Sequence, residues 1–364
     1  MHTPEDIIKL LPEYCVENII TLDTHLVTDR YVPLDVIVND TYKKISKDVK
    51  VIVWNATSEG INFSNSQRLV ELSQLLPECK HIHAVGLPAL SYYTNHWKKY
   101  AKKYNWDISN LYLLLTNYMA VTSANMTKHA DLQNIFSTKN KYEKRFIFLN
   151  NNHKYHRIRL LGLLNQRNLL NHGYVSYKHS PEKQFENVEN LTFPLHLDEW
   201  DDIKSENADP YDHMLGMSSS VFSYVEKSGF AIVSETNFLD LSHLNPNDDD
   251  EYNQLMNYPF MDHPVNTEKV FKFIGAQRPF IIAGYCGSLD ILRQMGFKTF
   301  HPYIDETYDQ IFCGEDRLNA IAMEVERLCK MSDREFLQLQ ENIEDILKHN
   351  LTVLLNQKKE LKLG

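Results

Sequence analysis

The sequence has few of the features that mark membrane, secreted or disulfide-stabilised proteins. It contains only 5 cysteines, 12 glycines and 13 prolines among 364 residues. No apolar run reaches the roughly 18 residues that a membrane span needs, and residues 1–6 lack the basic-then-apolar plan of a secretion signal. The cysteines are odd in number and scattered, which fits a reducing compartment and no closely paired zinc ligands. We therefore expect a cytoplasmic protein with no membrane partner.

Length and charge predict two domains of different character. A chain of 364 residues is too long for one ordinary core. The net charge is −10, but residues 1–145 hold 17 Lys and Arg against 15 Asp and Glu, which leaves 21 against 33 from the totals of 38 and 48. A polyanionic partner should therefore meet the first half of the chain.

Short runs rich in apolar residues predict an α/β fold with two Rossmann-like domains that face a cleft. Residues 51–54 and 80–85 read as strands with a helix between them, which is a βαβ unit. Further strands are expected at 18–22, 34–38, 111–115, 144–149, 173–177, 231–236 and 280–283. We place the domains at residues 1–140 and 141–330, followed by a C-terminal helix at 331–364. In such sheets, ligands bind beyond the carboxyl ends of the strands.

The segment 265–300 predicts a nucleotide site. Thr267 precedes apolar residues at helical spacing, so it should cap a helix whose first turn holds Glu268 and Lys269. A helix start favours phosphate, and a neighbouring lysine adds a mobile cation. A glutamate in this place can accept both hydroxyl groups of a ribose. The alternative is a capping glutamate beside a solvated lysine.

A second phosphate-binding turn is expected after the strand at 144–149. The polar residues 150–159 follow it and lead into an apolar helix. His153 and His156 lie three residues apart at the helix start, but no third metal ligand is in view, so a structural role for at least one is favoured. The acidic runs 198–202 and 248–251 read as solvated loops rather than a manganese site. We therefore expect no metal and no other cofactor.

Four lysines interleaved with aromatic residues form a candidate basic helix face in the first domain. They are Lys98, Lys99, Lys102 and Lys103. Such a face could meet phosphates while the rings stack on exposed bases. The alternative is a solvated helix face whose aromatic residues lie in the core.

Residues 144–328 resemble the donor domain of GT-B glycosyltransferases. The resemblance rests on Thr267-Glu268-Lys269, on the Pro-Phe-Ile-Ile strand that starts at Pro279, and on the Gly-Phe-Lys-Thr-Phe turn at 296–300. Similar runs occur in the alpha-fucosyltransferase and exostosin-like families and in phage and giant-virus glycosyltransferase-like proteins. A closing helix in GT-B enzymes commonly crosses back to the first domain, which is one expectation for residues 331–364. Self-association, giving a homo-oligomer, is the other.

The resemblance implies a role for several residues. It makes Arg157 the partner of the donor diphosphate, with His153 and Asn151 nearby, although relatives often have Arg where this chain has Asn151 and Asn152. It places Glu235 beside the sugar or the ribose. The loop that contains Glu59 is similar to the one that carries the proposed catalytic glutamate of alpha-fucosyltransferases, so Glu59 is a candidate base. The alternative is that it caps the next helix.

The implied activity is transfer of a sugar from a nucleotide-diphosphate sugar to an acceptor hydroxyl. We expect an inverting reaction that needs no metal, because Lys269, Arg157 and the helix-start amides could stabilise the leaving diphosphate. The sequence leaves the choice between retaining and inverting stereochemistry open. The acceptor would be a glycan or a hydroxymethylated base in viral DNA, with the four lysines as its contacts, and a viral protein would act in the host cytoplasm. The alternative is a non-catalytic protein that keeps the fold and binds a nucleotide sugar or a glycan. The sequence leaves the sugar and the nucleotide open.

Overall fold

The chain forms two compact units in the computed structural model. They are Met1–Met119 with Asn245–His263 and Lys358–Gly364, and Ala120–Leu244 with Pro264–Gln357. The structure describes residues 4–23, 48–55, 70–71, 73–74, 76–85, 98, 101–102, 104–116, 118–129, 142–150, 154–177, 187–193, 195, 197, 219–235, 238, 266–357 and 361–363.

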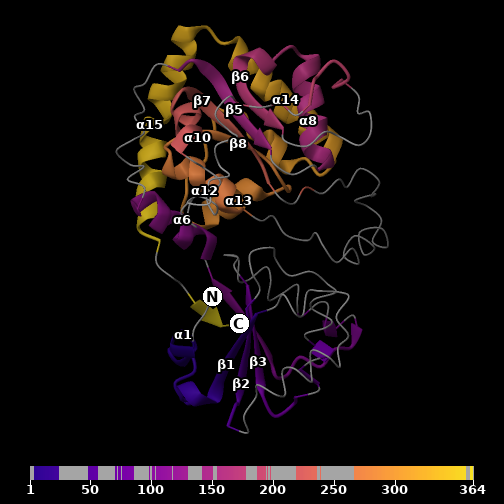
Figure 1. Cartoon of the computed structure of the whole chain (residues 1–364), viewed down its shortest axis with the longest axis vertical. Coiled ribbons are helices and arrows are strands. Elements are labelled where there is room, and N and C mark those ends of the chain that lie inside the picture. The colour runs from indigo at the N-terminus through magenta and orange to yellow at the C-terminus, as the bar shows by residue number, and fades with distance from the viewer. Residues whose placement is uncertain are drawn as a thin grey trace. The chain divides into compact units, whose positions relative to one another are not determined.

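A mainly parallel sheet forms the centre of the first unit (Figure 1). Its strands follow the order β1 (Ile19–Asp23), β2 (Val51–Asn55), β3 (Lys80–Val85), β4 (Leu111–Thr116) and β9 (Leu361–Leu363). The first four are parallel, and β9 is antiparallel to β4. The expected strands at 51–54, 80–85 and 111–115 are confirmed, whereas 34–38 lies outside the described residues.

A short helix packs on this sheet through apolar contacts. Ile7 and Leu11, in and just after α1 (Pro4–Ile8), form a buried cluster with residues of the first three strands. The helix ends at Ile8, earlier than the expected Leu11, and the 3-10 helix η1 (Val16–Asn18) leads into β1. Trp54 on β2 is buried and its Nε1 donates to His81 Nδ1 at 3.2 Å, so the polar group of the largest core side chain has a partner.

The second unit contains a fully parallel sheet whose strand order reverses once. The order is β6 (Gly173–Tyr177), β5 (Lys144–Asn150), β7 (Ser228–Ser234) and β8 (Phe280–Ala283). From β5 the chain first adds a strand on one side and then returns to add two on the other. The switch point therefore lies between β5 and β7, where ligands bind in sheets of this type.

Helices flank this sheet on both sides (Figure 1). The crossovers through α8 (Tyr155–Gln166) and α12 (Glu268–Gly275) run in opposite directions along the sheet, so right-handed connections place them on opposite faces. The former packs with α14 (Gly314–Lys330), and α12 packs with α15 (Asp333–Leu355). The other elements are α10 (Ser219–Glu226), α13 (Ser288–Gln294), η2 (Leu170–His172) and η4 (Thr307–Gln310).

The second unit begins earlier and ends later than the domain expected at residues 141–330. Helix α6 (Tyr118–His129) belongs to this unit, where Thr127 packs so closely on Gly275 that a Cβ there would come within 2.5 Å of its Oγ1. The long helix α15 also belongs here, and its Gln340 donates to the carbonyl of Gly229. The C-terminal segment that joins the first sheet is β9. Thus, the segment counted with the first unit is a strand rather than the helix.

Among the described residues, no helix is long and apolar enough to cross a membrane.

Candidate functional site

The start of α12 has the cap that the sequence predicts. Thr267 has extended backbone angles, and its Oγ1 accepts a hydrogen bond from the backbone N–H of Lys269 at 3.4 Å. Its hydroxyl satisfies one of the free N–H groups of the first turn. The helix then buries Val270, Phe271 and Ile274 on the side that packs into the unit. This fixes Glu268 and Lys269 in the first turn.

Glu235 connects this helix start to the end of β7. It lies one residue beyond the strand and is fully buried. Its Oε1 accepts the backbone N–H of Thr267 at 2.8 Å, and its Oε2 accepts the Thr267 hydroxyl at 2.7 Å. Lys269 Nζ lies 3.8 Å from Oε2. Glu235 thus anchors the first turn of α12, and its carboxylate faces Thr267 and Lys269.

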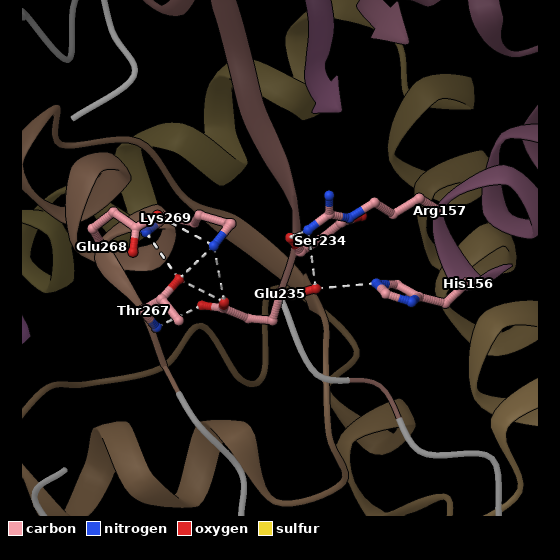
Figure 2. Close-up of polar contacts among 7 residues, drawn as sticks. All are labelled: His156, Arg157, Ser234, Glu235, Thr267, Glu268 and Lys269. Atoms are coloured by element: carbon pink, nitrogen blue, oxygen red, sulfur yellow. Dashed lines mark hydrogen bonds and ion pairs between the residues drawn. The ribbon is translucent and has the colours of Figure 1, made fainter. Parts of the chain in front are cut away.

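The backbone of the same residue connects to the start of α8. Because a carbonyl can only accept, His156 Nε2 donates to the carbonyl oxygen of Glu235, at 3.1 Å. Arg157 Nη2 lies 3.4 Å from the carbonyl oxygens of both Ser234 and Glu235. Figure 2 shows Thr267, Glu268 and Lys269 on one side of Glu235, and His156 and Arg157 on the other. The two expected phosphate-binding turns therefore meet at one residue.

The charges around Glu235 favour an anion. Three cations, Arg157, Lys269 and Lys272, accompany two carboxylates, Glu235 and Glu268, within the interacting group. The starts of α8 and α12 add positive dipole ends. Lys269 Nζ also contacts Glu268 Oε1 at 3.2 Å and Thr267 Oγ1 at 2.9 Å, so these contacts already position its ammonium group in the first turn.

Burial changes the pKa of most groups in this cluster. It raises the pKa of Glu235, against which the charge of Lys269 and the Thr267 hydrogen bonds act. Burial would also raise the pKa of Glu268, but Lys269 and Lys272 together bring it below its usual value. Burial lowers the pKa of Lys272 to about 8 despite the attraction of Glu268. The cluster thus contains ionisable groups whose charge depends on their neighbours.

His156 and Arg157 differ in charge although they are adjacent and both buried. Burial, followed by the charge of Arg157, lowers the pKa of His156 to about 3, so the imidazole is neutral near pH 7. Its ring stacks on Phe238 with centroids 4.9 Å apart. Burial also lowers the pKa of Arg157, but a guanidinium stays protonated in proteins. His156 therefore acts as a neutral donor to the backbone, while Arg157 supplies a cation.

Several predicted site residues lie outside the described part of the chain. They are Glu59, Asn151, His153, Lys99 and Lys103. Lys98 and Lys102 are exposed, while Ala101 between them is buried. Tyr104 and Trp106 stack with centroids 5.3 Å apart and are half-buried. These positions fit both a basic face and a solvated one.

The sequence did not single out three polar residues that the structure places in or beside this site. Asn150 ends β5, Ser234 ends β7, and Lys272 lies one turn into α12. Their position in the sequence could have indicated Asn150 and Ser234 as site residues, since each is a polar residue at the carboxyl end of a strand. Among the described residues, no group of three or more His, Cys, Asp or Glu side chains could hold a metal ion. The acidic runs at 198–202 and 248–251 are not described.

Comparisons with protein-family models, curated proteins and solved structures find no match to this chain. The fold class therefore rests on the structure itself, which is α/β with two sheets of mainly parallel strands.

Proposed function

We propose that the second unit binds a nucleotide-diphosphate sugar and that the protein is a glycosyltransferase. The observation that supports this most is the meeting of two helix starts, with Arg157 and Lys269, at Glu235 beside the switch point of a parallel sheet. A diphosphate carries the charge that such an arrangement favours. The GT-B-like arrangement of two Rossmann-like domains, suggested by the resemblance, is part of this proposal.

The proposed reaction needs a base and a stabilised leaving group. The acceptor oxygen forms a bond to the anomeric carbon of the sugar, and the bond from that carbon to the diphosphate breaks. The diphosphate leaves with the bonding electron pair, and Arg157 and Lys269 stabilise its charge. The proposed base, Glu59, takes the proton of the acceptor hydroxyl. The reaction would invert the anomeric centre and need no metal.

A panel of nucleoside diphosphates and nucleotide sugars tests donor binding by thermal shift. A ligand at ~100 times its dissociation constant adds about 2.7 kcal/mol, which should raise the melting temperature by roughly 5–10 °C for a unit of this size. Lys269→Ala should weaken binding about 10- to 100-fold, since it removes one charged hydrogen bond. The exposed Lys298 provides the matched control, Lys298→Ala. Unchanged affinity in Lys269→Ala would contradict the proposed site.

Transfer assays separate the enzyme from a binding protein that keeps the same fold. The enzyme should convert a donor in the presence of glycans or DNA that contains hydroxymethylated bases. Glu59→Gln should then lower kcat with little effect on donor affinity, because a base acts only on the acceptor proton. Tight donor binding without turnover on any acceptor would favour the non-catalytic alternative. If DNA is the acceptor, Lys98→Glu with Lys102→Glu should weaken duplex binding and reduce its salt dependence.

A further inference from the structure

Two buried polar side chains at the carboxyl edge of the second sheet have atoms with no hydrogen-bond partner. They are the amide of Asn150, at 2% exposure, and the hydroxyl of Ser234, at 5%. Both Nδ2 and Oδ1 of Asn150 are unsatisfied, as is Ser234 Oγ. Such groups are uncommon in folded proteins because each costs free energy, so a specific one indicates a water, an ion or a ligand.

The strand register places these two side chains on the same face of the sheet. Phe148 pairs with Ile232, so two residues further along Asn150 lies opposite Ser234. The other neighbour of Asn150 is Tyr177, whose hydroxyl interacts with the backbone of Lys154 at the start of α8. Residues opposite each other in a sheet share a face, so Asn150 and Ser234 lie on the α8 side. Glu235, the next residue, faces α12.

The unpartnered atoms are therefore next to the α8 half of the proposed donor site. Arg157 reaches the carbonyl oxygen of Ser234 from the first turn of α8. This helix start alone would favour any anion. The two side chains require a ligand group that can both donate and accept hydrogen bonds. A phosphate does not meet this requirement, because its oxygens accept hydrogen bonds but supply no donor for Asn150 Oδ1. A hydroxyl group both donates and accepts.

We infer that Asn150 and Ser234 bind hydroxyl groups of the nucleotide sugar, while Arg157 and Lys269 bind its diphosphate. This inference rests on the proposed function. The hydroxyl groups belong either to the ribose or to the transferred sugar, which present the same chemistry. Both side chains are covered in the structure, so binding must uncover them.

Isothermal titration of the full chain tests the inference. The probes are UDP and GDP, their 2′-deoxy and 3′-deoxy forms, UDP-glucose, GDP-mannose and inorganic diphosphate. Asn150→Ala and Ser234→Ala should each weaken binding of the hydroxyl-bearing probe about 10- to 100-fold. The control is Ser123→Ala, because Ser123 is also buried with an unpartnered hydroxyl but lies in helix α6 rather than at the end of a strand. Removing an unpartnered polar group should leave the melting temperature of the free protein unchanged or higher.

The probes distinguish the sources of the hydroxyl groups. If Asn150 binds the ribose, a deoxy form loses affinity for the wild type, and Asn150→Ala no longer discriminates it from the parent. If it binds the transferred sugar, the variant loses affinity for UDP-glucose or GDP-mannose but not for UDP or GDP. Equal losses for every probe, including inorganic diphosphate, would assign a phosphate contact and overturn the inference.

Two further outcomes separate the inference from the proposed function. If the wild type binds a probe and both variants bind it equally well, only the inference fails, and water satisfies the unpartnered atoms. If the wild type binds none of the probes, the proposed function fails and the inference fails with it.

Discussion

Replacing Asp309 by asparagine should remove a pH dependence from the stability of the second unit. Asp309 lies in η4 and is 2% exposed. Its carboxylate accepts the backbone N–H of Leu289 at 3.1 Å, and its carbonyl accepts the N–H of Gly287 at 2.8 Å. It therefore supports the turn that follows β8. Burial raises its pKa from 3.8 to about 7, with the hydrogen bond from Leu289 acting in the opposite direction.

The direction of this pH dependence follows from which state, folded or unfolded, binds the proton of Asp309 more tightly. The folded protein keeps Asp309 protonated up to about pH 7, whereas the unfolded chain releases the proton near pH 3.8. By itself, Asp309 therefore makes the free energy of unfolding highest below pH 3.8 and lowers it as the pH rises towards 7. Between pH 5 and pH 8 this one group should lower it by about 3 kcal/mol. In Asp309→Asn this contribution is absent, while the amide oxygen can still accept from Leu289.

Urea unfolding at several pH values between 5 and 8 measures the effect. The difference in free energy of unfolding between Asp309→Asn and wild type should shift in favour of the variant as the pH rises, with an unchanged dependence on urea. Asp316→Asn is the control, because Asp316 is exposed on α14. A difference that stays constant across this pH range would refute the reasoning, since it would mean that Asp309 titrates alike in both states.

The remaining predictions concern the two sides of Glu235. His156→Gln keeps a donor for the Glu235 carbonyl but removes a group whose pKa falls from 6.5 to about 3 on folding. The free energy of unfolding of the variant, relative to wild type, should therefore rise by about 2 kcal/mol as the pH falls from 8 to 5, as measured by urea unfolding. No pH dependence of that difference would contradict the burial argument. Glu235→Gln should lower the free energy of unfolding by about 1–3 kcal/mol, because an amide NH₂ cannot accept the hydrogen bond from the Thr267 hydroxyl. It should also weaken UDP or GDP binding, measured by titration. Tighter binding would show that the carboxylate repels the ligand rather than positioning Lys269.

Local sequence predicted the strands and the helix cap well because each depends on nearby residues. The runs at 51–54, 146–149 and 280–283 are apolar and largely β-branched or aromatic, as strands buried on both faces require. Thr267 has a hydroxyl at the point where apolar residues begin to recur at helical spacing, so its cap could be predicted. The carboxyl-edge position of Glu235 followed from the strand that precedes it.

The sequence could not predict what Glu235 contacts. The resemblance placed it beside the sugar or the ribose. In the structure both carboxylate oxygens accept hydrogen bonds from Thr267, and the side chain is fully buried. The proximity of Asn150 and Ser234 was equally hidden, because residues 84 positions apart meet only once β5 and β7 become neighbours. Strand order depends on the crossovers and on which faces the helices cover, and no local pattern specifies it.

The sequence by itself determined the approximate positions of strands β1 to β8, the cap of α12 and which strands end in polar residues. It did so because hydrophobic runs, caps and strand ends depend on neighbouring residues. Only the tertiary structure decided that the starts of α8 and α12 meet at one buried residue, Glu235, and that Asn150 and Ser234 share a face. These contacts join segments separated by more than 30 residues, and they form only when packing sets the order of the strands.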